Sequence, residues 1–234
     1  MPRKPTTKTI LFADGSKSVF NKNGNGEGTL YFQESKNAWR ASYVLEGETI
    51  RRYVTEMKRA VNSLVVMVDD LFELVQLDQG VIEAEIARAR FEDVARSAIA
   101  ACESHAAQKG LVIETDLHGA ESSLCSPRLT RVLQNLLQNA IRHTPADGTV
   151  RIEARQTAGA LEVVVTDTGE GIDEASLGRV FEPFFRVDDA RSQGGSGLGL
   201  AIAKRIVEAM GGDITVASKP QSGSRFAILL PDRA

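Results

Sequence analysis

Two asparagines in the segment RVLQNLLQNAIRH, residues 131–143, are the first side chains with a clear chemical use. Asn135 and Asn139 are four residues apart, so a helix stacks them on one face, although asparagine prefers caps and turns. An amide oxygen is a hard, neutral ligand that suits a Mg²⁺ ion bridging phosphates. Arg142 and His143 follow on the next turn. The segment predicts a polar helix edge suited to a metal–phosphate group, with a pair of structural asparagines as the alternative.

A second candidate is DTGEGID, residues 167–173, which directly follows the apolar run LEVVVT. Asp167 therefore ends a predicted buried strand, where its carboxylate faces whatever lies above the sheet. Gly169 and Gly171 permit positive φ and a close approach of backbone to a ligand. Because Asp and Gly are also common turn residues, a plain tight turn is the alternative interpretation.

A third candidate is the glycine-rich segment GGSGLGL, which starts at Gly194 and runs straight into a helical pattern. Glycines before a helix aim backbone N–H groups at an anion bound at the helix N-terminus. The segment lacks the GK[ST] of a P-loop, and its G-x-G-x-G spacing without a preceding strand differs from the dinucleotide fingerprint. A flexible linker is the alternative.

Other arrangements of reactive residues are absent from the sequence. His105, His118 and His143 are scattered without metal-ligand spacing, and no nucleophile-elbow motif occurs. FEPFFRV, residues 181–187, concentrates three phenylalanines in a predicted loop. These aromatics form either a satellite core cluster or the anchor of a lid over the glycine-rich loop.

The elements that position these candidates indicate an α+β fold with a mixed sheet covered by helices on one face. Amphipathic helices are predicted at 91–110 and 126–143, a short one at 175–184, and a long one from 197. The sheet is predicted to contain LVIETDL and two hairpins, one at 149–169 and one at 213–231. We expect three parts: a β-prone segment at 1–46, a helix at 47–80, and a catalytic domain at 81–234.

The helix at 48–78 carries an a/d heptad pattern over four repeats. Tyr53, Ala60, Met67 and Leu74 recur beside that seam and widen it. A broad apolar stripe favours a four-helix bundle formed by a homodimer through residues 48–78, and an ordinary internal core helix is the alternative. Residues 1–46 hold β-prone runs separated by Asp-Gly and Asn-Gly turn signals. GTLYFQES within them is similar to the cleavage site of expression tags, so a native and an engineered origin both stay open.

Composition places the chain among ordinary globular proteins, with 42% hydrophobic and 25% charged residues. A net charge of −3 gives no reason to expect a nucleic-acid partner. Cys102 and Cys125 are interpreted as small buried hydrophobes in a reducing compartment. No apolar run is long enough to span a bilayer, and no signal-peptide core follows the basic start. We therefore expect a cytoplasmic chain without membrane contact, whose parent protein is either free or membrane-anchored.

Four segments together resemble the bacterial sensor histidine kinases. LQNLLQNAIRHTP, DTGEGI, FEPFFR and GGSGLGLAI are similar, in this order, to the N, G1, F and G2 boxes of that family, and SGSRF at 222–226 resembles a weak G3 box. The resemblance covers about residues 48–231. It implies an ATP-binding α/β sandwich after a dimerisation helix, with ATP and Mg²⁺ as cofactors.

The same resemblance implies a role for each matching residue. Asp167 would bind the adenine amino group, and Gly169 and Gly171 would shape the base pocket. Asn139 would coordinate Mg²⁺ beside Asn135, Arg142 would reach the phosphates, His143 would lie near the adenine, and Arg186 would approach the γ-phosphate from the lid. Asn135, Arg142 and Arg186 are the predicted catalytic residues. The remaining cofactor-binding residues are Phe184, Gly195, Gly197, Leu198, Gly199 and Ser224.

One family element is missing. The phosphoacceptor histidine of the family lies in an H box on the helix before 48–78, and none of the three histidines here has such a context. The acceptor helix is therefore deleted, replaced by the β-prone segment, or diverged beyond recognition. The expected partners are a response regulator or a separate acceptor-helix domain.

Three functions compete on these residues. The first is a histidine kinase core that transfers phosphoryl only to a histidine supplied in trans. The second is a conformational ATPase of the wider superfamily with gyrase and heat-shock chaperones, whose members carry a water-activating glutamate where Asn135 stands; an amide cannot act as a general base. The third is an ATP-sensing pseudokinase that pairs through its helix. Anti-sigma-factor kinases are a further class, disfavoured by the dimerisation helix.

Overall fold

The computed structural model describes residues 7–11, 17–21, 29–33, 38–42, 47–79, 88–186 and 196–231. These residues belong to two compact units, Met1–Asn62 and Ser63–Ala234, which divide within a long helix. In the first unit, β1 (Thr7–Leu11) pairs antiparallel with β2 (Lys17–Asn21), and β3 (Thr29–Gln33) pairs antiparallel with β4 (Ala38–Ser42). The β-prone runs predicted the first three strands but not β4, because its run AWRAS lacks strong strand formers apart from the tryptophan.

The second unit is built on a five-stranded sheet in the order β10–β11–β9–β8–β6. Its strands are β6 (Val112–Asp116), β8 (Thr149–Thr157), β9 (Ala160–Asp167), β10 (Asp213–Ser218) and β11 (Ser224–Pro231). β6 pairs parallel with β8, and the other pairs are antiparallel. The mixed sheet and both predicted hairpins are therefore confirmed. A short pair, β5 (Ala89–Arg90) with β7 (Leu124–Cys125), lies outside this sheet.

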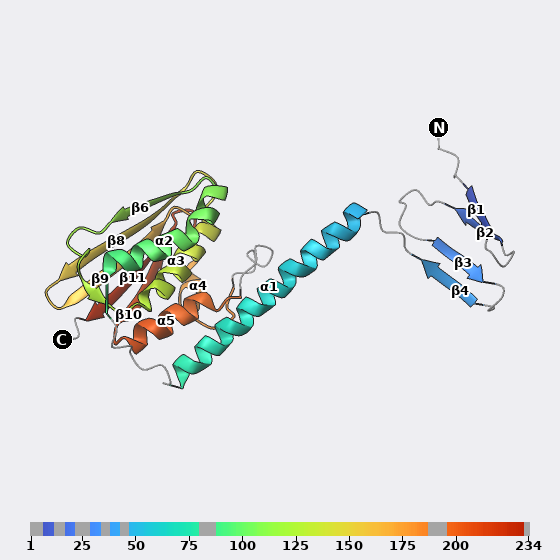
Figure 1. The fold of residues 1–234 in the computed structure, drawn as a ribbon. Coiled ribbons are helices and arrows are strands. Elements are labelled where there is room, and N and C mark those ends of the chain that lie inside the picture. The colour runs from blue at the N-terminus through green and yellow to red at the C-terminus, as the bar shows by residue number, and fades with distance from the viewer. Residues whose placement is uncertain are drawn as a thin grey trace. The chain divides into compact units, whose positions relative to one another are not determined.

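Helices α2 (Phe91–Gln108), α3 (Leu129–His143) and α5 (Gly199–Ala209) lie together on one face of that sheet (Figure 1). α3 packs against both other helices and against β8 and β9. The predicted helix at 175–184 is much shorter in the structure, where α4 spans Glu174–Leu177. Gly178 follows α4 directly, and Pro183 disfavours a continuing helix.

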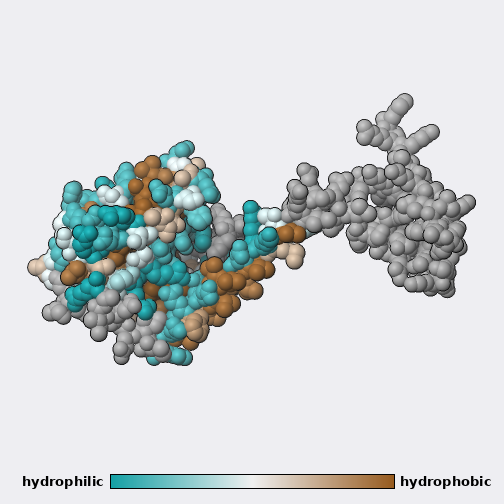
Figure 2. Space-filling model, viewed as in Figure 1, coloured by the Kyte–Doolittle hydropathy of each residue, from teal (hydrophilic) through white to brown (hydrophobic). Residues whose placement is uncertain are grey.

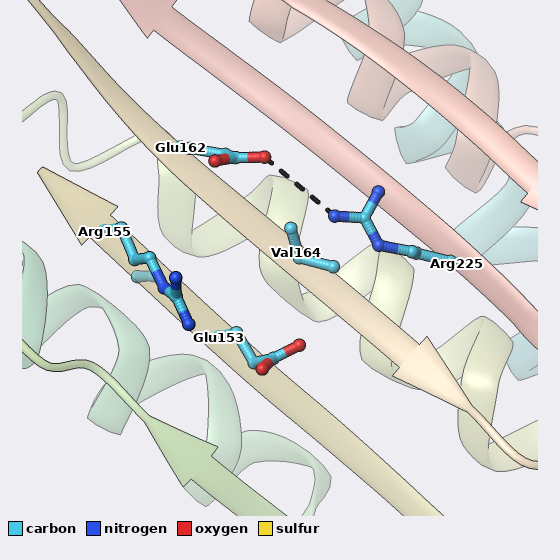
Figure 3. Close-up of a pocket in the computed structure, with 6 residues that line it drawn as sticks. Glu153, Arg155, Glu162, Val164 and Arg225 are labelled. Atoms are coloured by element: carbon cyan, nitrogen blue, oxygen red, sulfur yellow. Dashed lines mark ion pairs between the residues drawn. The ribbon is translucent and has the colours of Figure 1, made fainter. Parts of the chain in front are cut away.

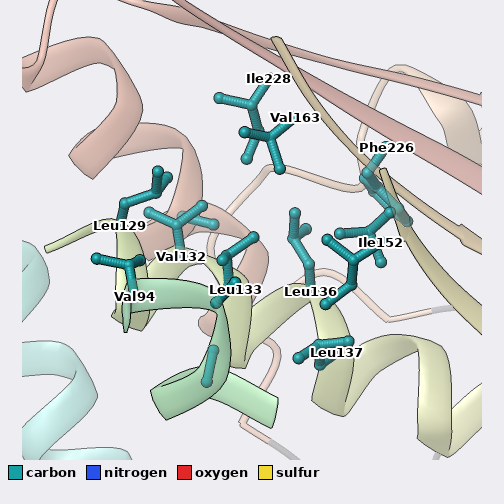
Figure 4. Packing of buried hydrophobic residues seen from close by; sticks show 14 of the residues in the cluster. Val94, Leu129, Val132, Leu133, Leu136, Leu137, Ile152, Val163, Phe226 and Ile228 are labelled. Carbon is teal, nitrogen blue, oxygen red and sulfur yellow. The ribbon is translucent and has the colours of Figure 1, made fainter. Parts of the chain in front are cut away.

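The core lies between the helices and the sheet (Figure 4). Leu133, Leu136 and Leu137 of α3 are fully buried and belong to the same cluster as Ile152, Val163 and Phe226 of the sheet. The buried positions on β9 alternate through Leu161, Val163, Val165 and Asp167, so the strand period turns the Asp167 carboxylate toward the helices. The packing that forms the core therefore also aims this carboxylate.

The opposite face of the sheet is open and charged (Figure 3). A hollow of about 230 Å³ lies there, lined by Glu153, Ala154, Arg155, Glu162, Val164 and Arg225. Arg225 Nη2 lies 3.9 Å from Glu162 Oε1. None of the predicted site residues lines this hollow, and its exposed ion pair contributes little to stability.

The long helix α1 (Gly47–Asp78) agrees with the prediction over 48–78. Its predicted a/d seam is exposed in the single chain, including Val54, Met57, Val61, Leu64, Val68, Leu71 and Val75, and Figure 2 shows hydrophobic residues gathered in a band along α1. Among the described residues, none of the helices is both long enough and apolar enough to cross a membrane.

The C-terminal part of α1 contacts the catalytic unit through a different face. Leu74 is buried in the core and Met67 packs against it, so these two do not widen the exposed seam as the heptad pattern predicted. Arg131 on α3 bonds Asp70 Oδ1 at 2.5 Å and Glu73 Oε2 at 3.1 Å. Asp70 is buried, and its other oxygen accepts a bond from Ser196 Oγ at 3.0 Å.

The core position of α3 gives a stability prediction. Leu133 is fully buried, so Leu133→Ala should lower the free energy of unfolding by about 2–5 kcal/mol through lost burial and a cavity. Gln138→Ala, on the exposed side of the same helix, should change it by less than about 0.5 kcal/mol. Chemical denaturation of both variants measures the difference, and equal effects would contradict the packing of α3 described above.

Candidate functional site

The carboxylate of Asp167 is held at the end of β9 by backbone amides. Its Oδ1 accepts hydrogen bonds from the N–H of Gly169 at 2.8 Å and from the N–H of Ser224 at 3.2 Å. Ser224 begins β11 directly opposite Asp167 in the sheet register. Burial raises the pKa of Asp167, while these two amides and the nearby charge of His143 lower it. The carboxylate is thus fixed in direction and shielded from solvent.

The backbone of the loop after Asp167 packs closely against the backbone of two other segments. A Cβ on Gly169 would lie 2.5 Å from the carbonyl oxygen of His143, and one on Gly171 would lie 2.0 Å from that of Lys219. Only Gly171 has the positive φ expected for both, at +72°. For Gly169 the prediction of a positive φ is wrong. Glycine is required there because the backbone passes close to the end of α3, and this close approach is to protein backbone.

His143 lies at this same corner. Its Nδ1 is 2.6 Å from Glu170 Oε1, and its backbone oxygen accepts a hydrogen bond from the N–H of Glu170 at 3.1 Å. The end of α3 and the loop after β9 are therefore joined twice. Glu170 is a site neighbour that sequence reasoning missed, although it lies within the DTGEGID segment.

The two asparagines occupy different environments on one face of α3. Asn135 is buried, and its Nδ2 has no hydrogen-bond partner among the described residues. Its side chain lies beside the start of α5, where a Cβ on Gly199 would be 3.5 Å from Asn135 Oδ1. Asn139 is half-buried one turn later. A buried amide donor without a partner fits an acceptor such as a phosphate oxygen, and the amide oxygen of the half-buried Asn139 suits Mg²⁺.

Two arginines lie close enough to affect one another. Burial lowers the pKa of Arg142, and the neighbouring charge of Arg186 lowers it further. Arg142 belongs to α3 and Arg186 follows the phenylalanine-rich segment, 44 positions apart in sequence, so the fold brings the two cations together. A pair of like charges favours an anion between them.

The glycine-rich loop meets the phenylalanine-rich segment through its backbone. The N–H of Phe184 donates to the carbonyl of Gly197 at 2.9 Å, and a Cβ on Gly197 would lie 3.0 Å from Phe184 Cα. Leu198 is fully buried at the start of α5, and its N–H bonds Ser196 Oγ at 3.2 Å. Gly195 lies outside the described residues.

The three phenylalanines of that segment separate in the structure. Phe181 packs edge-on against core residue Phe226, with ring centroids 6.3 Å apart. Phe185 lies under the guanidinium of Arg179 at 4.4 Å, whereas Phe184 is 54% exposed with a φ of +64°. Phe181 therefore belongs to the core, and Phe184 is presented to solvent beside the glycine-rich loop.

These contacts gather the predicted residues around α3. Asp167, Ser224, Gly169 and Gly171 lie at its C-terminal end, and Leu198 and Gly199 lie beside Asn135. The rise of a helix separates Asn135 from His143 by roughly 12 Å. Within the described ranges no group of three or more His, Cys, Asp or Glu side chains is placed to hold a metal. A ligand along α3 would meet the Asp167 carboxylate at the C-terminal end of the helix, and then Arg142, Asn139 and Asn135 in turn toward the start of α5.

Comparison with known proteins agrees with this geometry. The family described as histidine kinase-, DNA gyrase B- and HSP90-like ATPase matches residues 125–234. The alginate biosynthesis sensor protein KinB of Pseudomonas aeruginosa is 34% identical over 80% of this chain and 31% of its own length. The sensor-like histidine kinase SenX3 of Mycobacterium tuberculosis is 36% identical over 80% of this chain and 46% of its own. The chain thus spans about a third to a half of these relatives.

Solved structures show the same fold. Full-length ShkA in complex with AMPPNP has a TM-score of 0.69 and 30% identity over 80% of this chain and 40% of that one. The mycobacterial sensor histidine kinase MprB has a TM-score of 0.52 and 31% identity over 62% of this chain and 96% of that one. With the relatives in sequence and the matching sheet and helices, these likenesses show the family. The chain belongs to the bacterial sensor histidine kinases and carries their catalytic ATP-binding domain.

Proposed function

We propose that this chain is the phosphoryl-donating core of a histidine kinase, which transfers the γ-phosphoryl group of Mg-ATP to a histidine on a separate acceptor helix. The observation that carries the proposal is the buried Asp167 carboxylate, held by two backbone amides at the C-terminal end of α3. If the adenine base of ATP binds at the Asp167 carboxylate, its phosphates extend along α3 toward Asn139, Asn135 and the start of α5.

At the base end, Asp167 accepts a hydrogen bond from the exocyclic amino group of adenine. The amides of Gly169 and Ser224 keep the carboxylate from rotating, so the direction of its acceptor is set before the nucleotide arrives. Gly171 passes so close to the carbonyl of Lys219 that a side chain there would clash with it. A guanine base offers an oxygen at the equivalent position, which a carboxylate repels, so the site selects adenine.

At the phosphate end, charge is balanced by Arg142, Arg186 and the amides of Asn135 and Asn139. The Asn139 amide oxygen would hold Mg²⁺, which would supply positive charge to offset that of the transferring group. Burial and the charge of Arg186 lower the pKa of Arg142, and an anion near both arginines would offset their mutual repulsion. Backbone N–H groups in the first turn of α5 complete the surroundings of the triphosphate.

The residue at 135 favours phosphoryl transfer over hydrolysis. An ATPase needs a base to activate water, and an amide has no basic group at neutral pH. Asn135 is also buried, and its Nδ2 has no hydrogen-bond partner among the described residues. The superfamily ATPase alternative is therefore the weaker one on the residues of this site.

The receiving histidine comes from outside this chain. His143 is engaged by Glu170, His118 lies on the surface near Asp116 at 3.8 Å, and His105 is on α2 outside any H-box context. The exposed apolar seam of α1 supports pairing with a second copy of the chain and packing against acceptor helices. A response regulator then receives the phosphoryl group. The alternative, an ATP-sensing pseudokinase, rests on the same missing H box.

Asp167→Asn tests the base site. Loss of the charged acceptor should weaken ATP binding by about ten- to a hundredfold, measured by calorimetric titration.

Because burial raises the pKa of Asp167 above its ordinary 3.8, the contribution of this group to the free energy of unfolding is full below that value and is lost as pH rises through the raised pKa. The variant should therefore unfold at pH 7 with equal or greater free energy than wild type. Unchanged ATP affinity would remove the proposed base site.

Asn139→Ala tests the metal ligand. The Mg²⁺ concentration that half-saturates ATP binding should rise by about tenfold or more, since one neutral oxygen ligand is lost. Gln138→Ala on the neighbouring exposed position is the matched control and should bind as wild type does. An identical Mg²⁺ dependence in both variants would assign the ion to other ligands.

Self-labelling tests the missing acceptor. The purified chain, incubated with γ-labelled ATP and Mg²⁺, should retain no acid-labile phosphate, because none of its histidines is placed as an acceptor. Autoradiography after alkaline and acidic washes distinguishes phosphohistidine from phosphoserine. Strong acid-labile labelling would show that one of His105, His118 or His143 receives phosphate after all.

A further inference from the structure

The C-terminal end of α3 carries the residues that the proposed function depends on, and its backbone carbonyls have identifiable partners. The last carbonyl groups of a helix lack partners within it. The Ala140 oxygen accepts from the N–H and the hydroxyl of Thr144, at 3.0 and 2.7 Å. The His143 oxygen accepts from the N–H of Glu170 at 3.1 Å. The oxygens of Ile141, Arg142 and Thr144 remain.

A single side chain satisfies all three. Lys109 Nζ lies 2.8 Å from the Ile141 oxygen, 2.8 Å from the Arg142 oxygen and 2.9 Å from the Thr144 oxygen. An ammonium group has three N–H donors, so every donor of Lys109 is engaged. A cation at a helix C-terminus is also favoured by the helix dipole.

Lys109 reaches this place because it ends another helix. It is the C-cap of α2, and its own N–H donates to the carbonyl of Ala106 at 3.1 Å, while the N–H of Gly110 donates to that of Ala107 at 3.1 Å. Gly110 follows with a φ of +69°, which turns the chain into β6. The residue is half-buried and lies more than 30 positions before the carbonyls that it contacts. A lysine that looks like an ordinary helix stop therefore joins α2 to the end of α3.

We infer that Lys109 is a positioning residue for the nucleotide site, which holds the last turn of α3 and thereby Asn139, Arg142 and His143. The inference rests on the proposed function. Two of the three bonded carbonyls belong to Arg142 and its neighbour Ile141, so loss of the ammonium releases the backbone that aims the Arg142 guanidinium. It also loosens the His143 carbonyl that anchors the loop carrying Gly169.

The geometry requires lysine in particular. Three carbonyl oxygens converge on one nitrogen atom, which matches the tetrahedral ammonium group. A guanidinium presents its donors in a planar fork spread over three nitrogen atoms, so Lys109→Arg keeps the charge and loses the convergence. This variant separates the effect of charge from that of position.

The test uses Lys109→Met, Lys109→Arg and Lys109→Cys, the last before and after alkylation with 2-bromoethylamine, which restores an ammonium at nearly the same reach. Cys102 and Cys125 are buried, and burial raises the pKa of both thiols, that of Cys125 to about 11. Buried thiols of this kind react slowly, and alkylated wild type is the control. Ile228→Ala, a fully buried core truncation on β11, controls for loss of stability alone.

Two readouts are taken in each protein. The first is hydrogen exchange of the amides of Thr144 and Glu170 in the absence of nucleotide, which reports the order of the helix end. The second is the affinity for Mg-ATP. We expect faster exchange and about tenfold or weaker binding in the Met, Arg and unmodified Cys variants, recovery on alkylation, and binding within about twofold of wild type in Ile228→Ala.

The outcomes separate the two proposals. Wild-type affinity for Mg-ATP in Lys109→Met, or failure of alkylation to restore lost affinity, would overturn the role of Lys109 and leave the proposed function standing. Absence of Mg-ATP binding by wild type itself would contradict the proposed function. Loss of affinity in Ile228→Ala equal to that in Lys109→Met would show that Lys109 contributes stability only, which also overturns its positioning role.

Discussion

Burial of the apolar face of α3 against the sheet is the constraint on which the site depends. Leu133, Leu136 and Leu137 fix the rotation of that helix about its axis. Because the helix is rigid, this rotation also sets the direction of its polar face. Asn135 is carried into the interior beside α5, and Asn139 and Arg142 are carried toward the surface. On β9, the alternation of strand side chains puts Asp167 on the same face as Val163 and Val165, so its carboxylate faces the helix layer near the C-terminal end of α3.

The sequence predicts those parts of the site that are local. The four-residue spacing of the asparagines, the aspartate after an apolar run and the glycines before a helix all depend on neighbours in the chain. The part that could not be predicted depends on distant segments. Lys109 has no motif and meets α3 through three carbonyls that any sequence would supply. Gly169 is needed because of His143, and only the fold reveals that approach.

The helix α1 shows a limit of predictions from apolar periodicity. Met67 and Leu74 have the same seven-residue spacing as Tyr53 and fit a widened bundle seam, yet they pack against the core of the catalytic unit. A heptad pattern predicts which positions are apolar, but it does not predict which element covers them. The polar residues identify the contacting face of α1 better than the apolar ones do. Asp70 and Glu73 accept hydrogen bonds from Arg131 on α3, so they lie on the face of α1 that contacts the catalytic unit.

The charges of the site suit a donor of phosphoryl groups. Burial and the nearby charge of Arg186 lower the pKa of Arg142. A bound polyanion would offset the repulsion between these two charges. The acceptor side has no equivalent, because the three histidines of the chain lie outside any acceptor context. Donor and acceptor are therefore separate requirements, and we propose that the residues described here meet the first.

The decisive measurement is phosphoryl transfer in trans. The chain, γ-labelled Mg-ATP and a separate acceptor-helix domain from a histidine kinase are mixed, and the label on each protein is followed with time. Acid-labile label should accumulate on the acceptor domain in proportion to the amount of chain added, and an acceptor with its histidine replaced should stay unlabelled. Tight binding of Mg-ATP without any label on the acceptor would identify a pseudokinase and contradict the transfer function.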